Sequence, residues 1–181
     1  MIELLTALTV LAQLVVIIAL GSWMLSRFCG GPRALDLLTR WIGSDSLRLA
    51  WLVAAVAMAG SLYMSEARHF QPCVLCWYQR IAMYPVVLIL GIASLRRDLT
   101  AWWYALPFAL IGAAISVYHY QLERFPDQEQ IACSATVPCT TIWFEQLGYI
   151  TLPMMALSAF ALIATVLTIG KRHGQSIANQ A

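Results

Sequence analysis

The chain has 181 residues, of which 61% are hydrophobic and 11% are charged. An ordinary soluble domain is about half apolar and about a quarter charged, so this composition predicts an integral membrane protein. The formal net charge of +2 gives no indication of nucleic-acid binding. A soluble protein of this length could not bury the apolar stretches that the chain contains.

Apolar stretches follow one another along the chain at residues 4–25, 49–64, 81–95, 101–118 and 147–170. A transmembrane helix needs about 20 residues, or about 17 at the short end. We expect each stretch to cross the membrane, the second one by taking in residues at its ends. The sequence therefore predicts an all-α integral membrane protein with these five stretches as its transmembrane helices.

Basic residues set the expected orientation, because cytoplasmic loops collect Lys and Arg. With the N-terminus outside, the inner segments hold Arg27, Arg33, Arg40, Arg48, Arg96, Arg97, Lys171 and Arg172, and the outer segments hold only Arg68, Arg80 and Arg124. This asymmetry predicts an outer N-terminus and a cytoplasmic C-terminus. The chain opens Met-Ile-Glu without a basic region, so we expect the first stretch to be a retained helix and not a signal peptide.

The segment "GPRALDLLTRWIG" at residues 31–43 lies in the expected inner loop between the first two spans. Its apolar residues recur at helical spacing, with charged residues on the other side. Pro near its start and Gly at its end suit the two ends of a helix. The pattern predicts a short amphipathic helix on the inner membrane surface.

The expected topology separates the five cysteines by side. Cys73 and Cys76 fall in the first outer loop, Cys133 and Cys139 fall in the second, and Cys29 is alone on the inner side. Close cysteine pairs on an oxidising face indicate disulfides, whereas a single inner cysteine indicates a free thiol.

Two structural alternatives remain for the outer cysteines. Four cysteines could bind a structural zinc ion, although such sites occur mostly in compact soluble domains. The pairs could also form inert disulfides, but a Cys-x-x-Cys ring closes only a few residues and stabilises little. A c-type haem would need His after the second cysteine of the first pair, where the chain has Trp77. We favour a redox-active pair.

The surroundings of Cys76 suit redox chemistry. Its expected place at the start of the third span puts it near unpaired backbone N–H groups that stabilise a thiolate. Arg80 follows four residues later, on the same helix face and about 6 Å deeper. A cation there favours the thiolate and can stabilise an anionic oxygen of a membrane-dissolved acceptor. The alternative is an interfacial anchor whose charge reaches the headgroups.

Several motifs in residues 47–170 carry a family resemblance. "PCVLCWYQRIAMYP", "SVYHY" and "TVPCTTIWFEQLGYITLPMMALSAF" resemble the disulfide bond formation protein B (DsbB) family, especially its short-loop, BdbC-like branch. The resemblance implies a four-helix bundle in the bacterial cytoplasmic (inner) membrane. Such a bundle takes electrons from a periplasmic, thioredoxin-like oxidase of the DsbA type and passes them to a quinone, either ubiquinone or menaquinone.

The resemblance also implies roles for the outer cysteines. Cys73 and Cys76 look like the quinone-proximal pair, with Cys76 contacting the quinone and Arg80 activating it. Cys133 and Cys139 look like the pair that meets the partner protein. From the residues, we expect Cys133 to be the more exposed sulfur, because it follows a polar segment whereas Cys139 precedes an aromatic one.

His119 lies at the outer end of the fourth span, in "VYHYQ". Such a depth is unusual for an ionisable residue. We expect it either to hydrogen-bond a quinone carbonyl or to belong to the interfacial aromatic belt with its flanking tyrosines.

The resemblance divides the chain into an N-terminal helix with a cytoplasmic segment (1–46), a quinone-reducing bundle (47–170) and a cytoplasmic tail (171–181). The best-studied members of the family space the second cysteine pair more widely and lack this extra N-terminal transmembrane helix, so residues 1–46 take no role from the family. One rival interpretation is a non-catalytic scaffold with structural disulfides or a four-cysteine metal site. Another is a quinone-linked reductase like vitamin K epoxide reductase, in which Cys-x-x-Cys lies toward the end of the bundle.

Overall fold

The computed structural model describes residues 2–29, 42–43, 45–128, 133 and 137–178. Within these residues, five long helices are apolar enough to cross a membrane, which confirms the predicted all-α membrane fold. They are α1 (Ile2–Cys29), α3 (Ser46–Glu66), α4 (Val74–Arg96), α5 (Trp102–Arg124) and α6 (Leu152–Ala178), and two short 3₁₀ turns lie at η1 (Leu99–Ala101) and η2 (Pro126–Gln128).

The helix bounds differ from the apolar stretches at several ends. Helix α4 begins at Val74, in agreement with the expected place of Cys76 at the start of the third span, and α5 continues to Arg124 instead of ending near 118. The expected start of the last span at 147 is wrong, because Leu147 and Gly148 adopt left-handed backbone conformations and form a turn before α6. The amphipathic helix expected at 31–43 lies almost entirely outside the described residues.

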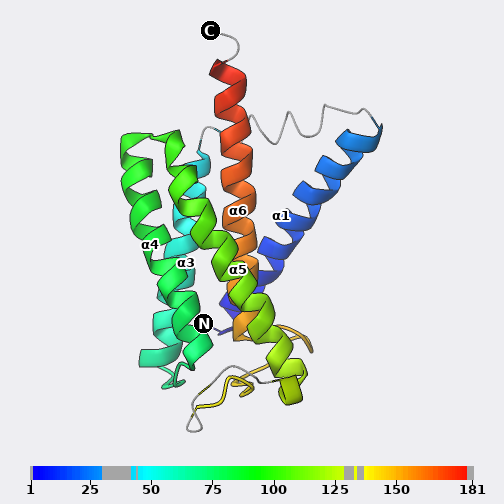
Figure 1. The fold of residues 1–181 in the computed structure, drawn as a ribbon, viewed down its shortest axis with the longest axis vertical. Coiled ribbons are helices and arrows are strands. Elements are labelled where there is room, and N and C mark those ends of the chain that lie inside the picture. Colours follow the sequence, from blue (N-terminus) through cyan, green and yellow to red (C-terminus); the bar gives the residue numbers. More distant parts are fainter. Residues whose placement is uncertain (1, 30–41, 44, 129–132, 134–136, 179–181) are drawn as a thin grey trace.

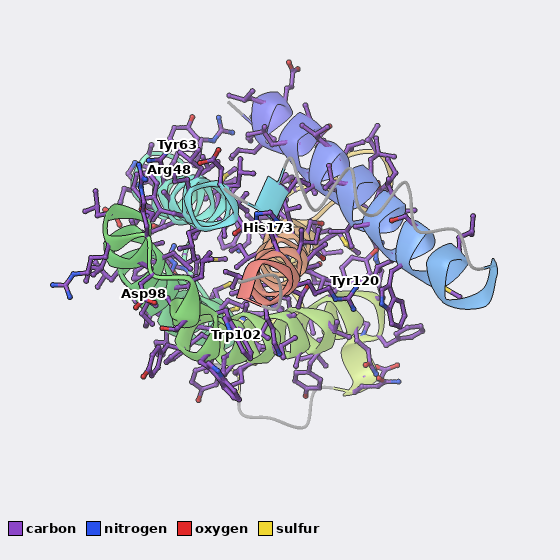
Figure 2. The ribbon with its side chains drawn as sticks, turned by 90° about the horizontal axis from the view of Figure 1, so that it is seen from above. Arg48, Tyr63, Asp98, Trp102, Tyr120 and His173 are labelled. Atoms are coloured by element: carbon purple, nitrogen blue, oxygen red, sulfur yellow. A yellow bond between two sulfur atoms is a disulfide. The ribbon has the colours of Figure 1, made fainter. Side chains whose placement is uncertain are left out.

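Helices α3, α4, α5 and α6 form a four-helix bundle (Figure 1). Helix α6 packs against both α5 and α3, and α4 packs against those same two helices. Helix α1 packs on α6 near its own N-terminal end and then diverges from the bundle, as Figure 1 shows. Seen along the bundle in Figure 2, α1 lies beside α6 and away from α4.

Small residues allow the helices to approach closely. Ala50, Ala54, Ala105 and Ala109 are fully buried between them. A Cβ atom at Gly112 of α5 would overlap the ring of Phe160 on α6, which is itself fully buried. Small residues at helix contacts are typical of membrane proteins, where packing and not water exclusion holds helices together.

The two ends of the bundle differ in chemistry. At one end, Asp98 accepts hydrogen bonds from the backbone N–H (2.9 Å) and hydroxyl (2.6 Å) of Thr100, and the Lys171 ammonium lies 3.9 Å from the ring centroid of Trp102. Figure 2 labels Asp98 and Trp102 at this end. At the other end α1 and α6 begin, α3 and α5 end, and α4 starts (Figure 1). We call this second end the cysteine end, because it carries Cys73, Cys76, Cys133 and Cys139.

Candidate redox site

The first cysteine pair forms the start of α4. Cys73 is the N-cap residue, with an extended backbone, and its sulfur accepts a hydrogen bond of 3.3 Å from the backbone N–H of Cys76. A sulfur in this position satisfies one of the unpaired N–H groups at a helix start. The two sulfur atoms are 2.9 Å apart, and both cysteines are free thiols in this structure.

His119 approaches the same pair from α5. Its Nε2 atom lies 3.6 Å from the sulfur of Cys73, and the histidine is buried. The hydrogen bond from the Cys76 thiol, helped by His119, holds the pKa of the Cys73 thiol below its ordinary value, although burial acts in the opposite direction. The sequence argument placed the thiolate on Cys76, whereas these contacts favour charge on Cys73. Two thiols this close lose their protons as a coupled pair.

Arg80 is buried in the bundle. Its Nε atom donates a hydrogen bond to the hydroxyl of Ser61 and its Nη2 atom donates one to the Ser61 carbonyl, both at 3.0 Å. Its guanidinium carbon lies 5.2 Å from the ring centroid of Trp77. Among the described residues, no carboxylate pairs with it. Held this way by α3, Arg80 does not extend toward lipid headgroups as an anchor would.

Gln79 is a second buried polar side chain beside Arg80. Its amide nitrogen donates a hydrogen bond of 3.1 Å to the hydroxyl of Ser116, which in turn donates one of 2.8 Å to the carbonyl of Gly112. These bonds connect α4 to α5 and satisfy polar groups that would be costly to leave unpaired in a membrane.

The second cysteine pair is a disulfide between Cys133 and Cys139, with Cα atoms 5.8 Å apart. Cys139 is only 1% exposed and packs in a buried cluster with Cys73, Leu75 and Leu122. Cys133 is half-buried at the edge of that cluster. The structure thus brings the two pairs together and gives Cys133 the greater exposure, as expected from the sequence.

The loop before the dithiol and the loop after the disulfide meet through aromatic rings. Phe70, three residues before Cys73, stacks on Trp143 with ring centroids 5.0 Å apart. Trp143 follows the disulfide in the loop that leads to α6. The stack therefore holds the disulfide loop against the start of α4.

A cavity of about 390 Å³ opens between α1, α3, α4 and α6. Its lining at the cysteine end includes the polar residues Cys76, Gln79, Arg80 and Ser61 and the aromatic residues Phe70 and Trp143. Its deeper lining is mostly apolar, with Tyr84 and Phe160 among aliphatic side chains. Its volume falls within the range of small-molecule pockets. Of the four cysteines at the cysteine end, Cys76 alone lines this cavity.

His119 is not among the side chains that line the cavity. The structure places it with Cys73 and not where it could meet a molecule bound beside Arg80. This differs from the expected contact with a quinone carbonyl, and its burial differs from a place in an interfacial aromatic belt.

The positions of the cysteines also test the four-cysteine metal site considered from the sequence. The sulfur atoms of Cys73 and Cys76 and a ring nitrogen of His119 lie within 4.8 Å of one another, a spacing that could suit a metal ion. However, Cys133 and Cys139 are bonded to each other and cannot supply thiolate ligands. The arrangement does not fit the four-cysteine site considered from the sequence.

Some residues of this site were not identified from the sequence. Gln79 could have been found from the sequence, because it is a polar residue beside Arg80 at the start of an apolar stretch. Ser61 gave none, because a serine within a membrane helix is common and its contact with Arg80 depends on how α3 and α4 are rotated. Phe70 and Trp143 come together only through the folding of two loops.

The family model described as disulfide bond formation protein DsbB matches residues 44–170. The chain is 52% identical over 118 residues to disulfide bond formation protein C of Bacillus subtilis, covering 65% of this chain and 86% of that protein. It is 43% identical over 129 residues to a probable disulfide formation protein C 2 of Bacillus cereus, covering 71% of this chain and 93% of the relative. No solved structure matches the chain. The chain therefore belongs to the DsbB family of disulfide bond formation proteins.

Proposed function

We propose that this protein is a thiol oxidase of the bacterial inner membrane that reoxidises a DsbA-type, thioredoxin-fold partner and passes the electrons to a membrane quinone. The cysteine end would face the periplasm and the C-terminus the cytoplasm. Residues 47–170 would form the reaction unit, with 1–46 as an added helix and cytoplasmic segment and 171–181 as a tail.

The observation that carries this proposal is the spatial series of the four sulfur atoms, from the protein surface to the cavity. Cys133 is the more exposed member of its disulfide, and Cys139 packs with Cys73 in one buried cluster. Cys73 contacts Cys76, and Cys76 lines the cavity. The sulfurs thus lead from the surface to an apolar chamber, which suits a soluble donor and a lipid-soluble acceptor.

The proposed exchange moves one electron pair through three dithiol–disulfide couples. A partner thiolate attacks Cys133 and releases Cys139 as the leaving thiolate, and the partner's second thiol then resolves the mixed disulfide. The partner leaves oxidised, and Cys133 and Cys139 become thiols. They in turn reduce a Cys73–Cys76 disulfide and regain their own.

Cys76 then faces the acceptor. A quinone in the cavity would accept two electrons and two protons from the Cys73–Cys76 dithiol and leave as quinol, restoring that disulfide. His119 would hold the charge or proton on Cys73 while Cys76 reacts. Arg80 would place a positive charge where a quinone oxygen becomes negative, the arrangement that gives electrostatic stabilisation its effect.

The lining of the cavity fits such an acceptor. Arg80 and Gln79 offer N–H groups at the cysteine end, and a buried cation without a carboxylate partner is suited to an anionic oxygen. Carboxylates, which would repel such an oxygen, are absent from the described lining.

The test is extraction and spectroscopy of the purified protein. We expect quinone to be extracted in stoichiometric amount, and a visible absorbance to appear on reduction that Cys76→Ser abolishes and Cys29→Ser preserves. Analysis of the extract also shows whether the quinone is ubiquinone or menaquinone. Stoichiometric zinc without quinone, or a protein that leaves a reduced DsbA-type partner unoxidised, would instead support the non-catalytic scaffold.

A further inference from the structure

Helix α1 lies outside the span matched by the family model, yet it supplies part of the cavity wall. Leu5, Leu8, Thr9, Leu11, Ala12 and Val15 line the cavity from this helix. Four of them, Leu5, Leu8, Ala12 and Val15, recur at intervals of three or four residues, so they occupy one face. A helix that merely crossed the membrane beside the bundle would present no such continuous face to a chamber that contains Cys76.

The attachment of α1 is specific. The amide nitrogen of Gln13 donates a hydrogen bond of 3.0 Å to the hydroxyl of Ser158 on α6, and its carbonyl oxygen accepts one of 2.8 Å from the hydroxyl of Tyr149. Both polar ends of this intramembrane side chain are therefore satisfied by the bundle. Leu5 also lies close to Gly60 of α3, where an added Cβ would come within 3.3 Å of it.

The contacts of α1 and α4 with α3 give the depth of each part of the cavity. Arg80 bonds Ser61, and Leu5 lies against the adjacent Gly60, so Leu5 is level with Arg80. Leu11 lies six residues further along α1, or about 9 Å by helical rise, and Val15 about 15 Å. On α3 the lining continues inward from Ser61 to Leu52, again over about 13 Å.

The cavity is therefore an elongated chamber with a polar head and a mostly apolar inner part. Beside Arg80 its lining offers nitrogen, sulfur and hydroxyl groups, whereas the deeper lining between α1 and α3 consists of side chains such as Leu11, Val15, Leu52 and Val56. This polarity matches an amphiphile with a compact polar ring and a long branched hydrocarbon tail.

We propose that α1 forms the outer wall of a tail channel, which encloses the isoprenoid tail of the quinone and makes the protein prefer long-tailed acceptors. The proposal rests on the proposed quinone reduction and goes further, because it assigns a substrate-selecting role to a helix outside the matched family span. The ring would lie at the level of Leu5, and the tail would run past Leu11 toward Val15.

Two leucines of α1 provide a matched test. Leu11 and Leu14 are 57% and 51% exposed and differ by about one helical turn in depth, but only Leu11 lines the cavity. A tryptophan at Leu11 would occupy the channel, whereas one at Leu14 would meet lipid. The full-length variants are placed in lipid discs and reduced with a soluble dithiol, so that no partner protein is needed. Two quinones with the same ring are compared, one tail-less and one with a long polyisoprenoid tail.

We expect Leu11→Trp to lower kcat/KM for the long-tailed quinone relative to the tail-less one by about tenfold, the size expected when about two methylene groups lose their contacts. Leu14→Trp should keep the wild-type ratio. Gln13→Leu, which removes both hydrogen bonds of α1 without adding bulk, should shift the ratio in the same direction as Leu11→Trp.

An unchanged ratio in both Leu11→Trp and Gln13→Leu, with quinone still reduced, would overturn the channel and leave the proposed function standing. Equal losses with both quinones in Leu11→Trp would place that residue at the ring and overturn the tail assignment. If the wild-type protein reduced neither quinone, the proposed function and the channel would fail together.

Discussion

The Nε2 atom of His119, near the end of α5, lies 3.6 Å from the sulfur of Cys73 at the start of α4. This contact places an ionisable ring beside the thiol that is farther from the cavity. The second ring nitrogen, Nδ1, is buried without a hydrogen-bond partner among the described residues. His119 thus contacts the dithiol and does not line the cavity.

The first prediction concerns this contact. His119→Asn cannot place a nitrogen where Nε2 lies, so the thiolate of Cys73 loses a hydrogen bond and its pKa rises. A hydrogen bond to a charged group is worth about 1.5–3 kcal/mol and one pKa unit is about 1.4 kcal/mol, so we expect the pKa of Cys73 to rise by about one to two units. The pH dependence of Cys73 alkylation, followed by mass spectrometry of its peptide, measures the shift.

His69→Asn is the control, because His69 is exposed in the loop just before Cys73. Its left-handed backbone (φ 56°) also suits Asn. Alkylation profiles that coincide for His119→Asn and the wild-type protein would show that the ring has no influence on the thiol.

Arg80→Gln should slow electron transfer to quinone by about tenfold to a hundredfold and leave exchange with the partner protein unchanged. The physical reason is the loss of one charge-assisted hydrogen bond to the reacting oxygen, worth about 1.5–3 kcal/mol. Arg80→Lys keeps the charge but loses the paired contacts with Ser61, so its rate should be intermediate. Single-turnover kinetics separate the two half-reactions.

The matched control for Arg80 is Arg68→Gln, which removes an exposed arginine of the loop between α3 and α4. Quinone kinetics equal to wild type in Arg80→Gln would make Arg80 a structural link between α4 and α3 and no more.

The disulfide loop yields a trapping prediction. In Cys139→Ala, a partner bonded to Cys133 cannot be released by the internal thiol, so a mixed disulfide should accumulate. Cys133→Ala should accumulate little, because Cys139 is 1% exposed and its thiolate cannot reach a disulfide on the partner. The partner is a DsbA-type protein that lacks its own resolving cysteine and whose remaining cysteine is supplied as a mixed disulfide with thionitrobenzoate. The Cys133 thiolate attacks this disulfide and displaces thionitrobenzoate, and a non-reducing gel shows the crosslink. The reverse pattern would exchange the roles of the two sulfurs.

Gly112 gives a prediction about stability. Gly112→Ala places a methyl group against the ring of Phe160, so the free energy of unfolding should fall by about 1–3 kcal/mol. Gly21→Ala on α1 meets no atom within 4 Å and should be neutral or stabilising by up to about 1 kcal/mol through helix propensity.

Denaturation in mixed micelles of increasing sodium dodecyl sulfate measures both glycine variants. Combining Gly112→Ala with Phe160→Leu should recover part of the loss, since the smaller side chain makes room for the methyl group. Equal stability of the Gly112→Ala and Gly21→Ala proteins would contradict the close packing of α5 on α6.

The sequence was sufficient to predict that the five long helices exist and that Cys73 and Cys76 form a close pair, because hydropathy and the Cys-x-x-Cys spacing are local signals. It placed the end of α5 too early, since Leu122 and Glu123 are buried by tertiary contacts that no apolar window reveals. It placed the start of α6 too early, because Tyr149 and Ile150 are as apolar as residues of a transmembrane helix but lie in the turn that precedes α6.

The contacts of the site depend on rotation about helix axes. Whether Arg80 meets Ser61 or headgroups, and whether His119 faces Cys73 or an acceptor, changes with a rotation that leaves the sequence pattern the same. Likewise, a hydrophobic first helix predicts a membrane span, but not that Gln13 fixes it beside α6.

The exposed leucines at the cavity border determine how an acceptor would arrive. Leu8, Leu11 and Leu52 line the cavity and are also 40%, 57% and 50% exposed, so this border faces lipid hydrocarbon. Phe70 and Trp143 stack near the cysteine end. An acceptor would then enter the cavity sideways from the bilayer, so that its encounter with the protein takes place in two dimensions. Turnover should follow the mole fraction of acceptor in the lipid and stay constant when the aqueous volume of the assay is changed.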